Sequence, residues 1–359
     1  MDGPVKLMIY PYNPISEVLL KNRDLFDDYR IEVVASYKED EAALAYCASK
    51  YEVKADSFDT KMFQSVDAVL LVDMVVERTT EGYYSVATQA LECGKKVLCT
   101  ENTKNFLNGI DPILSEKITL LNNVHTLSQS YFQEGLLNIK TPIIAIAGEG
   151  EDCGKFESQM QLLRCLHNDG YRFGIINSNS YGALLGSTSW PRQLFSDTLC
   201  FEEKVLIANH YVFDFCKQND FDAVILGVPG GLSVLGTKCT NHFSEVPLVI
   251  SNAVNIDAAH INLYFDMNME EQFIEQYKTY CYYKYNLPVA SVGVSRQRVV
   301  NDMESHRFLF YHLDESFFSK DYVKKYCKEN GLINPNDLDA GSMIYKRIIR
   351  ALENNPQIV

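Results

Sequence analysis

A glycine-rich turn that ends in a lysine is the part of this sequence whose residue types point most directly to chemistry. The turn follows the apolar run 142–147, carries Gly148, Gly150, Gly154 and Lys155, and leads into a helical pattern. Backbone N–H groups of such a turn, together with the positive end of the following helix, bind phosphate. The sequence therefore predicts an anion- or phosphate-binding site made by these three glycines and Lys155.

The same turn departs from a nucleotide-binding loop in three respects. It holds one residue more between Gly148 and Gly154 than the G-x-x-x-x-G-K pattern, and Phe156 replaces the Ser or Thr that binds Mg²⁺. Three acidic residues accompany the single lysine, and each would repel a triphosphate by roughly 1 kcal/mol even when solvated. We therefore expect the architecture of a phosphate loop without its nucleotide chemistry.

A second glycine-rich segment, Pro229–Gly231, follows the apolar run 222–228. It resembles the region of MinD-type ATPases and dethiobiotin synthetase in which a strand ends in an Asp that holds Mg²⁺ or its water. Here Gly227 stands at that position, and Asp222 lies at the opposite end of the strand, ~17 Å away. The resemblance implies a degenerate P-loop domain that lacks both metal ligands. A glycine turn that only closes a βα unit is the alternative.

Small polar residues follow the next predicted strand and are candidates for a pocket. In an open α/β sheet, ligands bind at the carboxyl ends of the strands, and Arg192 could hold a carboxylate there through two hydrogen bonds. Ser and Asn are also common turn formers, so an ordinary loop is the alternative interpretation. The pocket candidates are Asn177, Ser178, Asn179, Ser189, Trp190, Arg192, Pro229, Gly230 and Gly231.

The other reactive residue types give no catalytic assignment. Cys153 lies at the expected start of a helix, whose dipole lowers a thiol pKa, but its acidic neighbours act in the opposite direction, so we interpret it as unreactive. The seven histidines show no metal-ligand spacing, and we predict no metal site. The tyrosine-rich segment 277–285 is interpreted as a half-buried helix, with a peptide-binding surface as the alternative.

Length and composition predict an ordinary globular protein of two domains. The chain has 359 residues, of which 47% are hydrophobic and 22% charged, values typical of folded proteins above single-domain size. A net charge of −14 without a basic run argues against nucleic acid as a partner. Cysteines without C-x-x-C spacing, and the lack of a signal peptide or long apolar run, predict a cytoplasmic protein with no membrane partner.

Apolar runs that alternate with helical patterns predict two doubly wound, mostly parallel α/β domains. Residues 1–140 are predicted to be Rossmann-like, and residues 141–359 P-loop-NTPase-like, with a connector over about residues 125–142. The first turn carries Pro11 and Pro14 where a dinucleotide fold needs glycines, so we expect no NAD or FAD there. The predicted strands are 5–10, 31–35, 68–72, 96–99, 143–147, 172–176, 222–228, 247–251 and 289–294.

Five short segments carry a resemblance that extends over most of the first 200 residues. They are 9–12, 24–31, 154–156, 170–171 and 189–191. Together they resemble a small family of peptide-maturation-system proteins, which are encoded beside radical-SAM maturases in clostridial gene clusters for Cys-rich ribosomal peptides of the bacteriocin kind.

The resemblance implies an accessory protein of peptide maturation that binds the precursor peptide or the maturase and needs no cofactor. The alternative is an ATP-dependent ligase or kinase-like enzyme, with ATP and Mg²⁺ as cofactors and Lys155 on the phosphates. A Rossmann-type oxidoreductase is a third function, disfavoured by the proline-rich first turn. A homodimer is compatible with the sequence.

Overall fold

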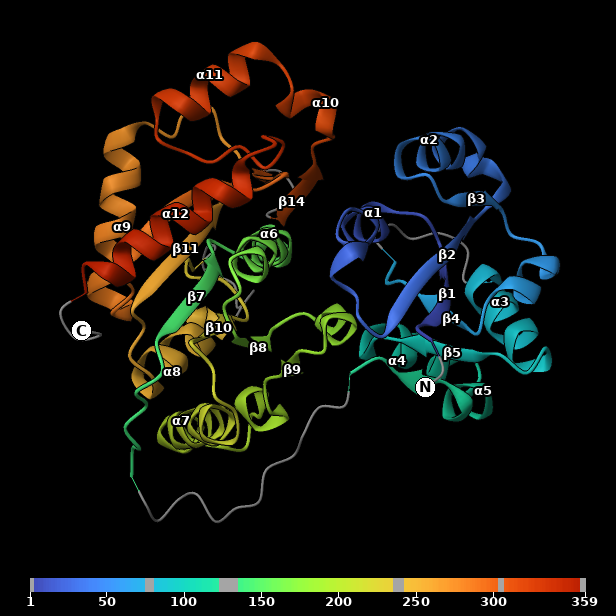
Figure 1. Cartoon of the computed structure of the whole chain (residues 1–359), viewed down its shortest axis with the longest axis horizontal. Coiled ribbons are helices and arrows are strands. Elements are labelled where there is room, and N and C mark those ends of the chain that lie inside the picture. The colour runs from blue at the N-terminus through green and yellow to red at the C-terminus, as the bar shows by residue number, and fades with distance from the viewer. Residues whose placement is uncertain (1–2, 75–80, 123–134, 235–241, 303–306, 356–359) are drawn as a thin grey trace. The chain divides into compact units, whose positions relative to one another are not determined.

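The computed structural model forms two compact units, each built on one six-stranded sheet with flanking helices (Figure 1). One unit comprises Met1–Asn123 and Ser180–Thr188, and the other comprises Val124–Asn179 and Ser189–Val359. The prediction of two mostly parallel α/β domains is thereby confirmed. Part of the predicted connector lies outside the described residues. The structure describes residues 3–74, 81–122, 135–234, 242–302 and 307–355.

The first unit alternates strands and helices along the chain. Its elements are β1 (Val5–Tyr10), α1 (Pro14–Lys21), β2 (Tyr29–Ser36), α2 (Glu41–Tyr51), β3 (Lys54–Ser57), β4 (Ala68–Leu71), α3 (Glu81–Glu92), β5 (Lys96–Cys99), α4 (Glu101–Ile110), α5 (Pro112–Lys117) and β6 (Thr119–Leu120). The strands pair in parallel in the order β3-β2-β1-β4-β5-β6, which is the order of dinucleotide-binding folds. The Rossmann-like architecture is therefore confirmed.

Aromatic side chains crowd the carboxyl end of β1, next to the proline-rich turn. The Tyr10 ring contacts the rings of Tyr37, Phe58 and Tyr83, with centroids 5.5, 6.1 and 5.7 Å away. A Cβ added to Gly82 in α3 would lie 2.6 Å from the Tyr10 hydroxyl and 2.6 Å from the Tyr37 ring. Burial raises the pKa of the Tyr10 phenol, so these side chains form a neutral, packed layer at this edge.

The segment Ser180–Thr188 packs with the first unit although it follows β8 of the second in sequence. Tyr181 is buried, and its hydroxyl oxygen accepts a hydrogen bond from the backbone N–H of Asp73 at 2.8 Å. The predicted division into residues 1–140 and 141–359 places this segment in the second domain, whereas it packs with the first unit. Tyr181 and Leu184 of this short segment are buried, and hydrophobic periodicity does not reveal such a return of the chain.

The second unit carries the glycine-rich turn on the central strand of its sheet. Its elements are β7 (Ile143–Gly148), α6 (Lys155–Asn168), β8 (Phe173–Asn177), β9 (Thr188–Ser189), α7 (Phe201–Gln218), β10 (Ala223–Gly227), α8 (Glu245–Ala253), β11 (Ala258–Leu263), α9 (Glu271–Tyr285), β12 (Val289–Val294), β13 (Gln297–Asp302), β14 (Arg307–His312), α10 (Glu315–Phe318), α11 (Asp321–Glu329) and α12 (Ala340–Glu353). The sheet order is β12-β11-β7-β10-β8-β9. β7 lies between β11 and β10 and runs parallel to both.

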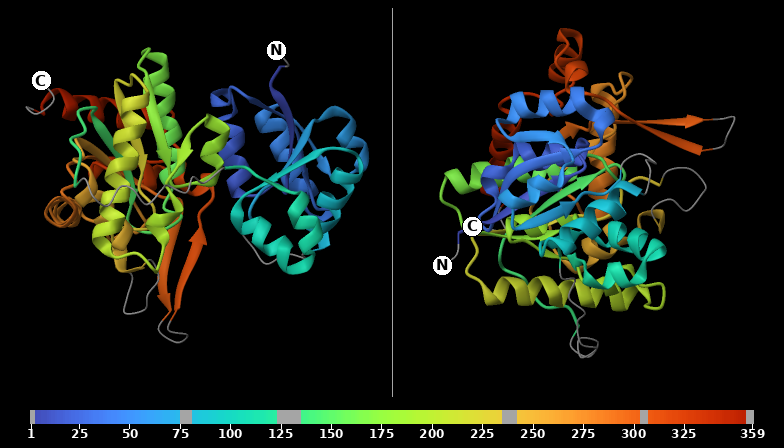
Figure 2. Two further views of the ribbon diagram at one scale, coloured as in Figure 1. Left: turned by 90° about the horizontal axis from the view of Figure 1, so that it is seen from below. Right: turned by 90° about the vertical axis from the view of Figure 1, so that its right-hand side faces the viewer.

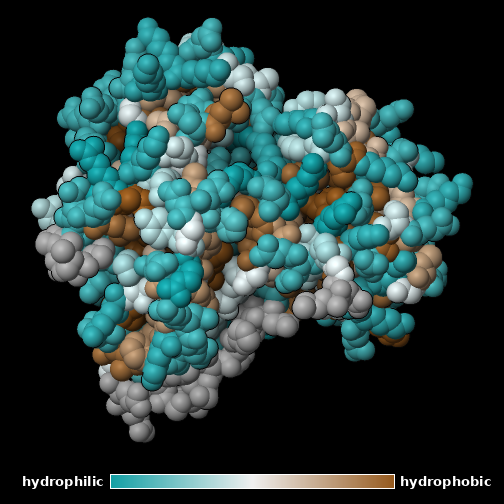
Figure 3. Space-filling model, in the orientation of Figure 1, coloured by the Kyte–Doolittle hydropathy of each residue, from teal (hydrophilic) through white to brown (hydrophobic). Residues whose placement is uncertain are grey.

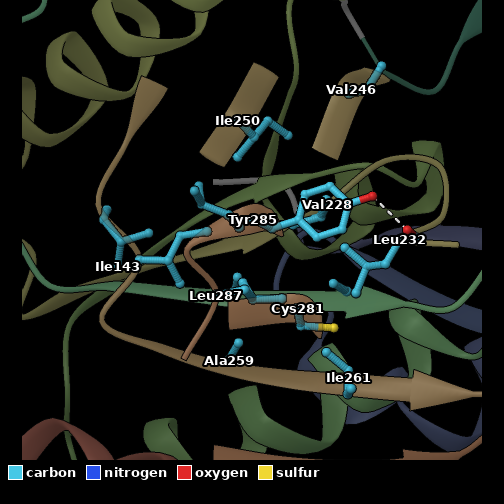
Figure 4. Close-up of a cluster of buried hydrophobic side chains, with 14 of the residues drawn as sticks. Ile143, Val228, Leu232, Val246, Ile250, Ala259, Ile261, Cys281, Tyr285 and Leu287 are labelled. Carbon is cyan, nitrogen blue, oxygen red and sulfur yellow. Dashed lines mark hydrogen bonds between the residues drawn. The ribbon is translucent and has the colours of Figure 1, made fainter. Parts of the chain in front are cut away.

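The main core of the second unit lies between its sheet and the helices α7, α8 and α9. In Figure 4, Ile143 of β7 and Ile250 of α8 lie near Tyr285, whose hydroxyl donates to the carbonyl oxygen of Leu232 at 2.6 Å. On the other face of the sheet α6 and α12 pack against each other. β7 is buried along its whole length, as expected for a central parallel strand.

Two features of the second unit differ from the sequence-based expectation. Residues 247–251, predicted as a strand, lie in α8, and the strand of this region is β11. A short apolar run does not separate helix from strand by its period, and Pro247 in the first turn is compatible with a helix. β13 and β14 form an unpredicted antiparallel ribbon that extends from the second unit (Figure 2).

The molecular surface is dominated by hydrophilic residues on the face drawn in Figure 3, with hydrophobic residues scattered among them. This agrees with a chain in which 22% of residues are charged. Among the described helices, none combines the length and the apolar character that a membrane crossing requires.

Gly174 in β8 tests the packing of this core, because a Cβ there would lie 2.5 Å from the rings of both Phe215 and Phe221. We predict that Gly174→Ala destabilises the second unit by about 1–3 kcal/mol, since packed rings must move. Urea unfolding followed by the fluorescence of Trp190, the single tryptophan, measures this change.

The control is Gly109→Ala in α4, where an added Cβ meets nothing within 4 Å. It should leave stability unchanged or slightly higher by circular dichroism, because alanine is the better helix former. A Gly174→Ala variant as stable as the parent protein would contradict the packing described here.

Candidate functional site

The predicted anion-binding turn connects the end of β7 to the start of α6. Asp152 and Gly154 have φ angles of 50° and 69°, in the left-handed region that allows the chain to reverse. α6 begins directly at Lys155. The structure thus places the positive end of a 14-residue helix at the turn.

A residue larger than glycine would be crowded at positions 148 and 150, because other side chains approach Gly148 and Gly150 closely. A Cβ on Gly148 would lie 3.0 Å from the Cβ of Cys153, and a Cβ on Gly150 would lie 2.2 Å from the hydroxyl of Tyr264. Gly148 and Gly150, two of the three glycines that the sequence predicts to bind phosphate, are therefore packed against the protein's own side chains.

Lys155 turns back onto the backbone of its own unit. Its ammonium group donates hydrogen bonds to the carbonyl oxygen of Gly150 at 3.0 Å and to that of Gly230. Desolvation lowers the pKa of this lysine. The lysine that the sequence predicts to bind an anion thus joins the turn to the Pro229–Gly231 segment.

The Cys153 thiol fills the inside of the turn. It is fully buried and donates to the carbonyl oxygen of Asn262 at 3.1 Å, while the backbone of Glu149 and Gly150 hydrogen-bonds to the sulfur. Burial raises the pKa of the thiol to about 12. At pH 8 only about one thiol in ten thousand is then ionised, which agrees with its interpretation as unreactive.

Tyr264, just beyond β11, covers the turn. Its hydroxyl donates to the carbonyl oxygen of Glu151 at 2.5 Å, and its backbone N–H donates to Oε2 of Glu149 at 3.0 Å. Burial raises the pKa of the Glu149 carboxyl, and the N–H of Tyr264 partly opposes this shift. The Tyr264 ring also contacts Phe310 of β14, with centroids 6.0 Å apart.

The residues after Pro229–Gly231 pair with the turn as a short strand would. The backbone N–H of Leu232 donates to the carbonyl of Gly148 at 2.9 Å, and that of Ser233 donates to the carbonyl of Glu149 at 2.9 Å. These two carbonyl groups are therefore satisfied inside the protein.

The tyrosines of α9 anchor the same segment from the other side. Tyr285 and Tyr280 donate to the carbonyl oxygen of Leu232 at 2.6 and 3.1 Å, and the hydroxyls of Tyr277 and Ser233 lie 2.8 Å apart. The tyrosine-rich segment is thus a helix with one buried face, as interpreted from sequence. Its role here is to position the second glycine-rich segment.

Neither of the two positions at which metal ligands are missing supplies an oxygen, and the position of Gly227 is also crowded. A Cβ on Gly227 would lie 3.0 Å from the backbone nitrogen of Ser178 and 3.3 Å from Oε1 of Gln159, so an aspartate there would require these neighbours to shift. The indole N–H of Trp190 donates to the Gly227 carbonyl at 2.8 Å. Within the described part of the chain, no three His, Cys, Asp or Glu residues are grouped as metal ligands.

The remaining pocket candidates are brought together only in part. Asn177 is buried at the end of β8, Ser178 is exposed, and the N–H of Asn179 donates to Oδ1 of Asn177 at 2.9 Å. Trp190 does not line a pocket: it is 2% exposed and belongs to the core. Arg192 is exposed at the start of a short 3₁₀ turn, so the two ends of the predicted pocket lining differ in environment.

Ser189 contributes its backbone to the fold instead of a side chain to a pocket. Its carbonyl oxygen accepts a hydrogen bond from the hydroxyl of Tyr211 at 2.7 Å. Tyr211 belongs to α7, so this bond fixes the chain just before Trp190 against that helix. An alternation pattern does not reveal a contact of this kind.

A buried polar network beneath the turn escaped the sequence analysis. Nδ1 of His260 lies 2.6 Å from the Ser291 hydroxyl, Nε2 lies 3.0 Å from Oδ1 of Asn262, and the Asn262 amide donates to Ser158 at 2.9 Å. Burial lowers the pKa of His260 to about 4, so the imidazole is neutral. His260 and Asn262 two positions apart in an apolar strand are the sequence signal.

A small pocket, partly open to solvent, lies beside this network at the start of α6. Arg296, 6% exposed, lines it. Its guanidinium lies 2.8 Å from a carboxylate oxygen of Glu315 and 3.6 Å from one of Glu157. The buried cation of this pocket is therefore already held by two carboxylates.

No protein-family model and no curated protein matches the chain. Among solved structures it is similar to a DUF1611 family protein from Anabaena variabilis, with a TM-score of 0.60 and 13% identity over 96% of this chain and 99% of that one. This likeness covers both units and shows the fold.

Two further structures align less well. A nucleotide-binding protein of Archaeoglobus fulgidus in complex with ADP gives a TM-score of 0.28 and 14% identity over 60% of this chain and 89% of that one. Chloroplast FtsY from Physcomitrella patens gives 0.28 and 11% over 77% and 78%. At these TM-scores neither structure adds to the assignment of the fold.

Glu149→Gln tests the burial of the carboxylate under Tyr264. Because burial raises the folded-state pKa above the unfolded value, ionisation destabilises the folded protein above about pH 4.3, and this penalty disappears as the pH falls to that value. Glutamine keeps an oxygen for the N–H of Tyr264 but cannot ionise. We expect Glu149→Gln to raise the thermal unfolding midpoint at about pH 7.5 and to leave it unchanged near pH 4.

Glu151→Gln is the matched control, because the side chain of Glu151 is exposed in the same turn. It should change the midpoint little at either pH. A gain from Glu149→Gln that is equal at both pH values would show that ionisation of Glu149 is not its cause.

Proposed function

We propose that this protein is an accessory protein that binds a partner and does not hydrolyse nucleotides. The observation that carries the proposal is the position of Lys155, whose ammonium group is engaged with the carbonyls of Gly150 and Gly230. A phosphate would have to break both hydrogen bonds and displace the Cys153 thiol from the turn. It would also meet the acidic side chains of the turn.

The missing metal ligands support the same proposal. Phosphoryl transfer depends on a cation that bridges phosphate oxygens. The side chain of Phe156 offers no ligand oxygen, Gly227 has no side chain, and a Cβ at Gly227 would be crowded. Without hydrolysis, binding is the remaining role for the carboxyl edge of the second sheet, where open α/β sheets place their ligands.

The proposed pathway is the maturation of a ribosomally synthesised peptide, with the precursor peptide or a radical-SAM maturase as the partner. The support for this pathway is the sequence resemblance of segments such as 9–12 and 189–191. A net charge of −14 favours a partner with a basic surface or a basic leader segment.

An ATP-dependent ligase or kinase-like enzyme is the second candidate. It is favoured by the retained backbone of the turn, with left-handed conformations at Asp152 and Gly154 and a helix that starts at Lys155. For this function, Lys155 must leave its two carbonyl partners and Tyr264 must uncover Gly150.

Calorimetric titration with Mg-ATP separates the two candidates. We expect no binding heat with ATP or GTP, with or without Mg²⁺, because Lys155 is hydrogen-bonded to two carbonyl groups and Phe156 and Gly227 supply no metal ligand. Phe156→Ser, which restores only the hydroxyl, should not create binding, since Gly227 still supplies no second ligand. A micromolar Kd that Lys155→Ala abolishes would replace the proposal with the enzyme.

Co-purification from the native gene cluster tests the partner. We expect the precursor peptide or the maturase to be retained, and hydrogen-exchange protection to appear at Gly148–Lys155, Asn177–Asn179 and Pro229–Gly231. Arg192→Ala, an exposed site, should weaken retention about tenfold if it holds a carboxylate of the partner. Protection confined to residues 3–122 would contradict the proposed binding edge.

A further inference from the structure

We propose that β13, one strand of the β13–β14 ribbon, joins two copies of this chain into a symmetric dimer. In this dimer, β13 of one copy pairs antiparallel with β13 of the second copy across a two-fold axis at Val300. The inference goes beyond the proposed function, because it concerns another surface of the second unit and another partner.

The ribbon, which extends from the second unit (Figure 2), is a sheet that has only two strands in the described part of the chain. A two-stranded ribbon is marginally stable in water, and an unpaired strand edge is a template for another chain. Three consecutive side chains of β14 are also exposed: Leu309 by 37%, Phe310 by 52% and Tyr311 by 49%. The ribbon therefore presents both an open edge and apolar surface.

Hydrogen bonds at the base of the ribbon show which backbone groups of β13 point outward. The N–H of Leu313 donates to the carbonyl of Arg296 at 2.7 Å, so Arg296 faces β14. The carbonyl of the next residue, Gln297, accepts from the N–H of Phe265 at 2.8 Å on the opposite side. Successive residues of a strand direct their backbone groups to alternate sides. The odd-numbered residues of β13 therefore direct their N–H and C=O groups to the outer edge.

Beyond Gln297, the outward backbone groups belong to Val299 and Asn301. Within the described residues, no other backbone group hydrogen-bonds to them. Antiparallel pairing centred on Val300 places Val299 opposite Asn301 of the second copy, and symmetry adds the reverse pair. Both are hydrogen-bonded pairs, each of which exchanges two bonds. Val300 lies opposite its own counterpart at a non-hydrogen-bonded position, where Cα atoms are about 4.5 Å apart. The backbone of β13 is thus compatible with this pairing.

The charged side chains of β13 are self-complementary about Val300. Arg298 and Asp302 lie two residues before and two residues after it, so each Arg298 lies opposite Asp302 of the second copy. These are non-hydrogen-bonded positions, where side chains are closest. Opposite charges directly across a sheet stabilise it and like charges destabilise it. Other registers separate these charges, so the charges select the register centred on Val300.

The pairing makes one four-stranded sheet from two ribbons. Leu309 of β14 lies opposite Val300 in the ribbon register, so the dimer carries a row of four apolar side chains across its two-fold axis. Three or more strands with an apolar face give a sheet the stability that a two-stranded ribbon lacks. The dimer therefore accounts for the exposed apolar surface on this face of the ribbon.

A second copy fits this edge better than the basic partner of the proposed function. Residues 297–312 contain two arginines, one aspartate and one glutamate, so their formal charges cancel in a chain whose net charge is −14. A segment without net charge does not attract a basic peptide, and it lets two acidic chains approach each other with less repulsion.

Two charge-reversal variants of the full-length protein test the pairing. Arg298→Asp places aspartates opposite each other, and Asp302→Arg places arginines opposite each other. By sedimentation equilibrium, we expect the parent protein to be a dimer and each variant alone to dimerise about tenfold or more weakly. An equimolar mixture of the two variants should form dimers again, because each acidic position of one variant then faces an arginine of the other.

Two further variants are the matched controls. Arg298→Lys keeps the charge at the pairing edge. Arg30→Asp makes the same reversal in the first unit, at a side chain that is 66% exposed. Both should dimerise like the parent protein, because neither places like charges across the two-fold axis.

Hydrogen exchange of single amides in the parent protein keeps the proposal falsifiable if a variant folds poorly. The outward N–H groups of Val299 and Asn301 should exchange slowly in the dimer and quickly on dilution to the monomer, whereas that of Val300 stays bonded to β14 in both. A monomeric parent, reversed variants that dimerise like the parent, or fast exchange of the two outward amides in a dimer would overturn the proposal. Slow exchange of these amides in a monomeric parent would show another occupant of the edge and would equally overturn it.

Discussion

The hydrogen bonds of the Lys155 ammonium group to the carbonyls of Gly150 and Gly230 are the interaction on which the loops at the carboxyl edge of the second sheet depend. They join the turn after β7 to the segment after β10, and the pairing of Leu232 with Gly148 continues the connection. Hydrogen bonds to a charged donor are stronger than neutral ones. In phosphate-binding loops the lysine at this position contacts the ligand, whereas here Lys155 holds the protein's own backbone in place.

The side chains around this interaction hold the turn and the segment after β10 in the same arrangement. Cys153 occupies the inside of the turn, Tyr264 covers Gly150, and the tyrosines of α9 fix the segment that receives Lys155. Cys153, Tyr264 and Tyr285 are buried, so removing any of them would leave a cavity or an unpaired polar group.

Much of the fold was predictable because the buried strands of a parallel sheet are short, nearly continuous apolar runs. β1, β4, β7 and β10 coincide with predicted apolar runs or nearly so, since central parallel strands are buried on both faces. β3 and the β13–β14 ribbon were missed because their strands mix polar and apolar residues. Residues 247–251 were misassigned because an apolar run of that length is also the buried face of a helix such as α8.

The sequence by itself determined the chemical inventory of the site: the glycines of the turn, Lys155, and the loss of ligands at Phe156 and Gly227. Residue identity suffices there, because no arrangement of Phe and Gly side chains supplies an oxygen to a cation. Only the tertiary structure decided where Lys155 points, that Trp190 is a core residue, and that Gln159 of α6 and Ser178 after β8 lie against Gly227. Those facts depend on the register of β8 and β10 and on the packing of α6, which join residues far apart in the chain and leave no local pattern.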